Sequence, residues 1–558
     1  MGLKGIIKFF TFRCLEILVV ALVIFLIPGL PPYAKISDSY TVKSAKPFEG
    51  KLALNNRLEL AEKWHEGEVH GAESFASFNG ELYTTLHGGD VVKFVGNHIT
   101  PIVRLGKPCS SLHEEKTCGR PLGITFDKSG NLFVADAYYG VFKVNVKTGE
   151  KTNLVSMDAE INGKKPKLPN SLVVAQNGDL YWTDSSTEFI LQDGIIDMLA
   201  DGSGRLIHYD AKTKTNTVLM ENIHFANGLI LSDGEEHLII SETGRNRLHR
   251  YYLKGPNKGK QEVFIDGLPG LPDNLRSDGK GGYLVPLVIA ADADHPNIPH
   301  IFAPFPKIRK VVARLFGLLD LCFETLNNYY PCAFAQKATH FIGHFNSMTP
   351  MLPKRATILH ISKTGEILDS IHANNKNFRT FSEAFIHKDT LYLGSPFNNF
   401  IGRVPLSKIG WNHLVQNAVP TPKPVTQPPP TQKPVTQAPT TTPRPTTTSS
   451  KPTTTTQKPP VQPQVTPTQA PKPKEAPKQQ TPSAKQQNPP PVKQQTPSPP
   501  KQTQPPKQQA SPPKPQTPPP AKQQSPPPQK QQTPPPKQQT PLPKQQQTAP
   551  TTQKPGKN

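Results

Sequence analysis

Short runs of alternating or β-branched apolar residues recur between about residues 48 and 414, separated by turns rich in Gly, Asn and Asp. The segments at 178–183 and 237–242 are examples. Helical periodicity is scarce around them. Runs of this length and alternation predict strands, so this part of the chain is expected to be all-β.

The strands belong to a repeating unit. Successive openings of the unit are separated by 48, 49, 57 and 46 residues, and they begin at Glu73, Pro121, Asn170, Asn227 and Asp273. The third unit is complete, with SLVVAQ, DLYWTDS, RLIHYDA and TNTVLME as its four strands. A four-stranded propeller blade needs about this length, so the predicted fold class is an all-β, six-bladed β-propeller.

The fifth and sixth units depart from the pattern. Residues 291–348 interrupt the fifth and include KIRKVVARLFGLLDLCFETL, whose apolar spacing predicts a helix. Strands resume at 356–361. The sixth unit, 381–404, is short of strands, and we expect residues 51–60 to supply its outer strand. Closing the ring with strands from both termini removes exposed sheet edges.

The N-terminus is basic and then apolar. Lys4, Lys8 and Arg13 precede an apolar run at 17–27, which is followed by PGLPP rather than by a small-residue cleavage site. This pattern predicts an uncleaved signal anchor, with a cleaved signal peptide as the alternative. Basic residues before the span leave the N-terminus in the cytosol. We therefore expect a type II, single-pass protein of the plasma membrane or another secretory-pathway membrane, with the propeller outside.

The C-terminal quarter consists almost entirely of Pro, Thr, Gln, Lys and Ser. Such a segment cannot bury enough apolar surface to order itself and is predicted to be disordered. Its Thr/Pro-rich part, 421–459, is typical of an O-glycosylated stalk, with an inert spacer as the alternative. The predicted organisation is an N-terminus and anchor at 1–35, a linker at 36–47, the propeller at 48–414 and a mucin-like tail at 415–558.

The formal net charge of +22 lies mostly in the tail. Residues 421–558 contain 18 Lys, one Arg and one Glu, a net charge of +18. The remaining chain carries only +4, so the folded region is close to balanced and no nucleic-acid partner is expected.

Cysteine usage agrees with export. Apart from Cys14 in the anchor, the four cysteines allow two local pairs, and we predict disulfides between Cys109 and Cys118 and between Cys322 and Cys332. Reduced, buried thiols are the alternative.

The residues that open the units carry the candidate chemistry. In a propeller the first strand of each blade lines the central channel, so these side chains converge. They are Glu73, Asn170, Asn227, Asp273 and Asn274. Carboxylate and amide oxygens without nitrogen or sulfur favour a hard cation, and calcium accepts such a set most readily. The alternative is that these residues only start strands and hydrate the channel.

The segments LPNSLVVAQNGDLYWTDSS, FANGLILSDGEEHLIISE, LPGLPDNLRSDGKGGYLV, CGRPLGITFD and GAESF resemble the strictosidine synthase-like family. Within it, the chain is similar to the animal adipocyte plasma membrane-associated proteins, and the tail resembles that of the insect membrane mucins called hemomucins. The resemblance covers residues 48–414. It implies a six-bladed propeller with calcium bound at the five positions just named. One departure is Ser171, where many relatives have Asp.

The catalytic residues of the related enzymes are matched less well in this sequence. Related paraoxonases hydrolyse lactones and esters with a histidine pair near calcium, but the matching positions here are Leu122 and the neighbourhood of Asp136. Strictosidine synthases use a glutamate in the last blade, and Glu383 matches it as a candidate acid or base. The alternative is a structural Glu383. His340 and His344 have helical i, i+4 spacing, but the sequence shows no third zinc ligand beside them.

These observations predict a membrane-anchored, cell-surface mucin-like protein. Its calcium-binding propeller would serve as a recognition or adhesion platform, with glycan or lectin partners reached through the tail. The alternative is a calcium-dependent hydrolase with arylesterase-like activity on a small-molecule ester. The long tail and the absent histidine pair favour the platform.

Overall fold

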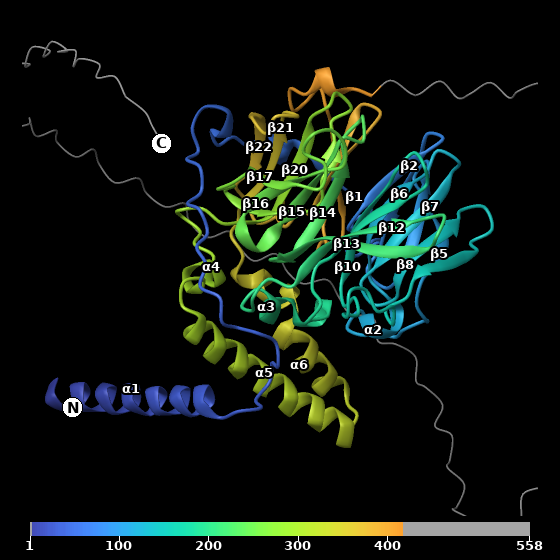
Figure 1. Ribbon diagram of the computed structural model, residues 1–558. Coiled ribbons are helices and arrows are strands. Elements are labelled where there is room, and N and C mark those ends of the chain that lie inside the picture. Colours follow the sequence, from blue (N-terminus) through green and yellow to red (C-terminus); the bar gives the residue numbers. More distant parts are fainter. Residues whose placement is uncertain (1–2, 417–558) are drawn as a thin grey trace, which may run out of the picture. The chain divides into compact units, whose positions relative to one another are not determined.

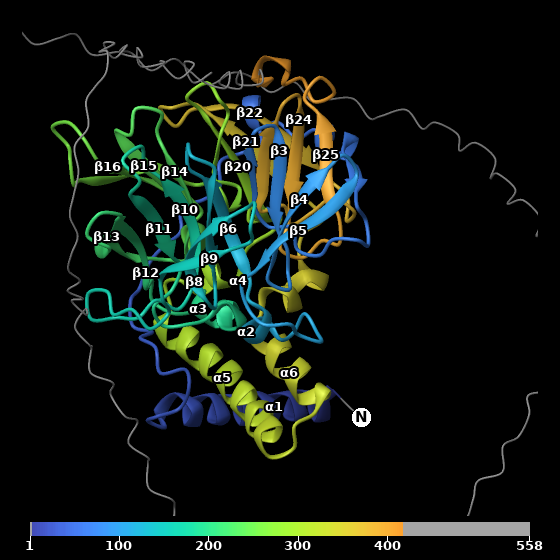
Figure 2. The same cartoon turned by 90° about the vertical axis from the view of Figure 1, so that its right-hand side faces the viewer.

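The computed structural model describes residues 3–416, and the predicted mucin-like tail from residue 417 onward lies outside the described residues. Within this range the strands form six antiparallel sheets, the number of blades expected from the sequence. Figures 1 and 2 show the sheets arranged as a propeller. The all-β fold class is therefore confirmed.

Four sheets take their strands in simple chain order. The first contains β2 (Phe75–Phe78), β3 (Glu81–Thr85), β4 (Asp90–Val95) and β5 (His98–Arg104). The second contains β6 (Pro121–Phe126), β7 (Asn131–Asp136), β8 (Gly140–Asn145) and β9 (Lys151–Val155). The third contains β10 (Pro169–Val174), β11 (Leu180–Asp184), β12 (Gly204–Asp210) and β13 (Thr215–Ile223). The fourth contains β14 (Ala226–Leu231), β15 (His237–Glu242), β16 (Arg247–Tyr252) and β17 (Gln261–Ile265).

The fifth sheet carries the insertion. Its strands are β18 (Gly270–Pro272), β19 (Arg276–Ser277), β20 (Tyr283–Ala290), β21 (Ala356–Ile361) and β22 (Ile367–Ala373). Between β20 and β21 lie α4 (Ile298–Phe302), α5 (Pro306–Tyr329), α6 (Ala333–Gly343) and the 3-10 helix η5 (Phe345–Met351). The helix predicted within residues 291–348 is thus confirmed. In both views α5 and α6 pair on one side of the sheets (Figures 1 and 2).

The sixth sheet closes the ring. It contains β23 (Glu383–His387), β24 (Thr390–Gly394), β25 (Ile401–Pro405) and, from the other end of the chain, β1 (Glu62–Trp64). Closure by the N-terminal segment was expected, but the predicted position at 51–60 was wrong. Those residues form η1 (Gly50–Leu52) and η2 (Arg57–Leu60), because Leu52 and Leu58 are buried in two different core clusters instead of alternating along a strand.

Short helices complete the connections. They are α2 (Glu115–Cys118), η3 (Leu191–Asp193), α3 (Gly194–Asp197), η4 (Thr243–Arg245) and η6 (Asn412–Leu414). The core fills the wedges between neighbouring sheets. Trp182 of β11, fully buried, packs with Phe133 of the preceding sheet. Truncation of such a side chain to Ala typically costs about 3–5 kcal/mol of folding free energy.

The N-terminal helix α1 (Leu3–Leu26) contains the single segment among the described residues that is long and apolar enough to cross a bilayer, Lys8–Leu26. Its 19 residues extend about 28 Å, close to the thickness of a hydrocarbon core. The chain after it is held against the propeller. The backbone N–H of Ser37 donates to Asp201 at 2.9 Å, and Tyr40 is buried.

One predicted disulfide is confirmed and the other is wrong. Cys109 and Cys118 are bonded, whereas Cys322 and Cys332 are free and exposed. The reason is the helix itself. After Cys322, α5 continues for seven residues to Tyr329, which carries the chain about 10 Å away before it can turn back.

Candidate metal centre

The five residues predicted to face the channel come together. Glu73 lies two residues before β2, while Asn170 and Asn227 lie near the starts of β10 and β14. Asp273 and Asn274 follow β18. All five are buried, and all except Asn274 line one pocket. Asn274 does not line the pocket, and its Nδ2 donates to the backbone oxygen of Glu73 at 3.3 Å.

Local irregularities of the strands place these side chains. The pairing of β10 with β11 shifts register between Pro169 and Leu172, next to Asn170, and that of β14 with β15 shifts at the equivalent place beside Asn227. A bulge of this kind redirects a side chain away from the regular alternation. Gly228 allows the backbone at Asp273 to come close, because a Cβ at position 228 would lie 2.2 Å from the backbone oxygen of Asp273.

Burial disfavours the charged forms of the Glu73 and Asp273 carboxylates. Burial raises the pKa of Glu73 to about 7, although the Arg120 guanidinium opposes the shift. Burial, and then the charge of Glu73, raise the pKa of Asp273 well above its usual value. Two buried acids with raised pKa values favour a bound cation or a retained proton.

The donor set fits a calcium ion. Oδ1 of Asn227 is buried without a hydrogen-bond partner, next to the two carboxylates. An unsatisfied buried oxygen is costly, and a cation would satisfy it. Glu73, Asn170, Asn227 and Asp273 offer side-chain oxygens, which are the ligands that calcium accepts.

Arg120 is a functional neighbour that the sequence reasoning missed. Its Nη2 lies 3.1 Å from Oε2 of Glu73, and its Nη1 donates to the oxygen of Gly71 at 3.2 Å. Leu122 holds the position of Asn170 and Asn227 in the second sheet, because Pro121, Pro169 and Ala226 each pair with the last residue of the following strand. This blade therefore offers no side-chain oxygen at that position, and Arg120 adds a fixed positive charge beside the cluster.

A largely apolar pocket lies over the oxygen cluster. Its walls include Leu122, Met198, Phe225 and Phe345, and it encloses about 670 Å³, part of it open to solvent. The resemblance to hydrolases placed a missing histidine at Leu122, and that side chain is a buried part of this wall. A small ligand with an apolar body can therefore contact the oxygen cluster.

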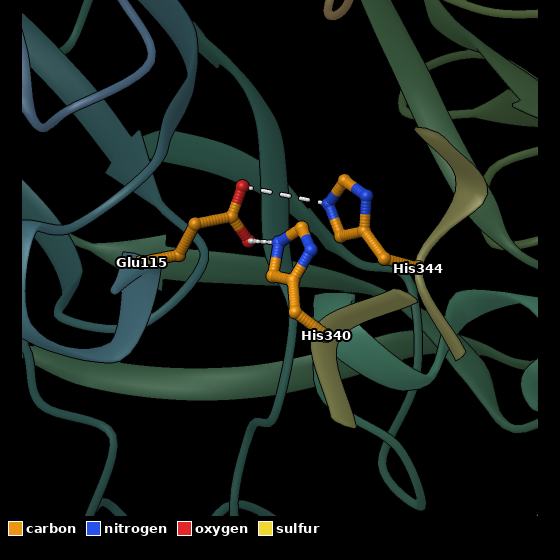
Figure 3. A group of neighbouring side chains, drawn as sticks. All are labelled: Glu115, His340 and His344. Carbon is orange, nitrogen blue, oxygen red and sulfur yellow. Dashed lines mark ion pairs between the residues drawn. The ribbon is translucent and has the colours of Figure 1, made fainter. Parts of the chain in front are cut away.

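A second cluster of titratable groups borders the pocket. Glu115, at the start of α2, points one carboxylate oxygen toward His340 of α6 and the other toward His344, as Figure 3 shows. Its Oε1 is 3.4 Å from Nε2 of His344, and its Oε2 is 3.9 Å from Nε2 of His340. Glu115 is the third group that sequence reasoning did not find beside the two histidines, because it lies 225 positions away in the chain.

Protonation argues against a metal at this second cluster. A histidine that binds a metal through one ring nitrogen normally donates a hydrogen bond from the other. Nδ1 of His344 instead accepts the backbone N–H of Asn346 at 3.1 Å, which leaves the proton of the neutral ring on Nε2. That Nε2–H faces Glu115. Burial lowers the pKa of His340 to about 3, so the His340 ring is neutral near pH 7.

Glu383 lies close to the channel, but its carboxylate is paired with Arg276. Arg276 donates to it through Nε, at 2.9 Å to both carboxylate oxygens, and through Nη2, at 2.7 Å to Oε2. The Glu383 side chain is fully buried and does not line the pocket. This geometry favours the structural alternative for Glu383, and its catalytic role stays a prediction.

Family models match two parts of the chain. The model described as strictosidine synthase matches residues 170–256, and the one described as strictosidine synthase-like, N-terminal, matches residues 50–94.

Among solved structures, a gluconolactonase from Xanthomonas campestris is similar, with a TM-score of 0.40 and 13% identity, covering 68% of this chain and 99% of that one. The calcium-binding protein regucalcin from Agrobacterium tumefaciens gives a TM-score of 0.38 and 12% identity, covering 62% and 93%.

Similarity to whole proteins is stronger. The Drosophila melanogaster adipocyte plasma membrane-associated protein Hemomucin is 42% identical over 410 residues, covering 72% of this chain and 71% of the relative. The adipocyte plasma membrane-associated protein of Salmo salar is 36% identical over 371 residues, covering 65% and 82%. The human one is 32% identical over 365 residues, covering 64% and 81%. The chain belongs to the adipocyte plasma membrane-associated protein family.

Proposed function

We propose that this protein is a membrane-anchored, calcium-dependent hydrolase of small, largely apolar esters or lactones. One observation carries the proposal: a cluster of buried side-chain oxygens from four blades forms part of a pocket whose other walls are mainly apolar. Calcium in the cluster and an apolar group against the walls would bring an ester carbonyl next to the ion.

The residues around the pocket would have three separate roles. Glu73, Asn170, Asn227 and Asp273 would hold the ion, which when bound polarises a carbonyl oxygen and acidifies a water molecule. Arg120 keeps the Glu73 carboxylate in place through its 3.1 Å contact. The apolar walls would orient the acyl or aryl group and keep bulk water away.

A second function, the recognition platform, is favoured by the tail. The Thr/Pro-rich segment 421–459 has the composition of an O-glycosylated stalk. Such a stalk would present glycans to lectin-type partners while the calcium-bound propeller serves as a rigid head. In both proposals α1 anchors the protein in type II orientation, with the propeller and tail on the extracellular or lumenal side.

Hydrolysis by the full chain in detergent micelles tests the first proposal. A phenyl ester and an aliphatic lactone would be assayed with calcium, with chelator, and with Asp273→Asn. Asp158→Asn, at an exposed carboxylate, is the matched control. We expect turnover with calcium that is lost with chelator and in Asp273→Asn but kept in the control. Absence of turnover with calcium bound would reject the hydrolase and leave the platform.

A further inference from the structure

The insertion exposes apolar side chains instead of burying them. Thirteen large apolar side chains are exposed between residues 298 and 351, whereas the other described residues from 48 to 416 expose six. Such a concentration of exposed apolar side chains in one segment is unusual on a protein that faces only water, and it indicates a contact with a partner or a membrane.

Helix α5 shows the arrangement most clearly. Five of its exposed apolar residues are spaced by seven, four, three and four positions, which places them on one face, while Leu321 and Tyr329 are exposed outside this set. The five are Ile308, Leu315, Leu319, Cys322 and Leu326. We call this set the α5 stripe. It contains no charged residue, and its leucine and isoleucine side chains are 40–48% exposed.

The opposite face of α5 is turned inward and buries two arginines beside the small residues Ala313 and Gly317. Arg309 is fully buried, and its Nη1 donates to the backbone oxygen of Leu199 at 2.7 Å. Arg314 is also buried on this side. A surface helix in water normally exposes its charged residues and buries its large apolar ones, whereas α5 buries both arginines and exposes the Leu and Ile side chains of the stripe. The α5 stripe is therefore suited to an apolar environment outside the protein.

Contacts with the anchor identify that environment. Nη1 of Arg314 donates to the oxygens of Ile24, Phe25 and Ile27 at 2.7, 2.9 and 2.9 Å, at the C-terminal end of α1. Gly317 allows close approach of the following segment, because a Cβ there would lie 2.9 Å from the backbone of Pro31. Figures 1 and 2 both show α1 beside α5. The α5 stripe thus belongs to a helix bound at the point where the anchor ends.

We propose that the insertion lies in the interface of the bilayer that α1 crosses, with the α5 stripe against the acyl chains. Tyr329 and Tyr330, both more than 70% exposed at the end of α5, suit the headgroup level. The ligand of the pocket is then a lipophilic ester that enters from the bilayer. This second part of the proposal rests on the proposed hydrolase function.

A second pocket adjoins the pocket over the oxygen cluster, because Met198, Leu271, Ile289 and Phe345 line both. It continues to Ile298 of α4 and to Met351 at the end of η5, both exposed. A ligand dissolved in the bilayer would reach the cluster along apolar walls.

A label on the native Cys322 tests the membrane contact. The full chain with Cys14→Ser and Cys332→Ser would carry a nitroxide at Cys322 in phosphatidylcholine vesicles. Serine at 332 keeps the helix cap that the Cys332 sulfur now provides. The control carries the label at Val95→Cys in a chain that also has Cys322→Ser, because Val95 of β4 is 48% exposed.

We expect the Cys322 label to be relaxed more by oxygen than by a water-soluble nickel chelate, and the Val95→Cys label to show the reverse. Equal behaviour of the two labels would overturn the proposal. Dipolar broadening between Cys322 labels at low protein density would also overturn it, because a second copy would then cover the stripe.

The double variant Leu315→Glu, Leu319→Glu tests ligand entry in the same vesicles. Hydrolysis of a long-chain aryl ester dissolved in the bilayer should fall at least about tenfold, while that of a short, water-soluble ester stays unchanged. Val95→Glu is the control. Equal loss on both esters would overturn entry from the bilayer. If the parent chain hydrolyses neither ester, the proposed hydrolase function and the entry of an ester from the bilayer are both rejected. The Cys322 label still tests the membrane contact.

Discussion

Nη2 of Arg120 lies 3.1 Å from Oε2 of Glu73, and Nε of the same guanidinium lies 3.9 Å from Oε1 of Glu115. One buried arginine is therefore shared between the channel oxygens and the cluster of Glu115 with its histidines. Its positive charge stabilises the calcium-free state of the channel and opposes cation binding there.

Replacement of Arg120 by Met should therefore have two effects. In chelator the free energy of unfolding should fall by about 3–5 kcal/mol, because a buried charge loses its partner. Calcium should then raise the melting temperature by more than it does in the parent chain. Arg205→Met is the matched control, since Arg205 pairs with the buried Asp184 at 2.7 Å. It should lower the melting temperature equally with and without calcium, and equal behaviour of the two variants would contradict the role of Arg120.

Neutralising Asp273 alone should stabilise the calcium-free protein. Asp273→Asn keeps the shape of the side chain, removes its repulsion with the buried Glu73 and leaves the pair of Glu73 and Arg120 intact. Its melting temperature in chelator should exceed that of the parent, and added calcium should raise it by less than in the parent. Thermal unfolding with and without calcium measures both effects. A lower melting temperature in chelator would show that Asp273 stabilises the fold without a cation.

The raised pKa of Glu73, about 7 against 4.5, gives the calcium-free protein a defined pH dependence. In this range the folded state binds more protons than the unfolded state, so stability is highest below about pH 4.5 and falls as the pH rises to 7. The loss from Glu73 alone should be on the order of 3 kcal/mol. Urea unfolding in chelator from pH 5 to pH 8 measures it, and saturating calcium should abolish it. Parallel pH profiles with and without calcium would contradict the assignment.

Glu383 and Arg276 should behave as a structural pair. Either Glu383→Gln or Arg276→Met should lower the free energy of unfolding by about 3–5 kcal/mol, and the double variant by less than the sum. Any hydrolysis by the folded fraction of Glu383→Gln should keep the parent turnover number. A well-folded Glu383→Gln variant with turnover reduced about a hundredfold or more would instead restore its catalytic role.

The cysteine arrangement predicts a thiol count. Denatured, unreduced protein should react with three equivalents of iodoacetamide, at Cys14, Cys322 and Cys332. Mass spectrometry would show one equivalent if Cys322 and Cys332 were bonded. Loss of the Cys109–Cys118 bond, which closes a loop of nine positions, should cost about 3 kcal/mol of stability.

The repeat explains why much of the channel could be predicted from the sequence. A fixed position in each unit maps to a fixed place on the propeller, so Glu73, Asn170, Asn227 and Asp273 could be assigned to one axis from spacing alone. The short strand β1 could not, because three residues carry no periodic signal, and its pairing with β25 depends on the ring closing.

The second cluster escaped prediction for a different reason. Glu115 meets His340 and His344 only because the insertion returns over the propeller to the segment that the Cys109–Cys118 bond holds. The spacing of the two histidines was visible, but the third group depends on the tertiary fold. The outward face of α5 was likewise hidden, since its periodicity predicts a helix without showing which side faces the protein.

Equilibrium dialysis of the full chain against radioactive calcium measures whether the channel oxygens hold an ion. We expect one ion per chain in the parent and none in Glu73→Gln, Asp273→Asn, with Asp158→Asn as the control that keeps binding. Equal calcium binding by the parent and the double variant, or none by the folded parent, would contradict the assignment of these oxygens as a calcium site.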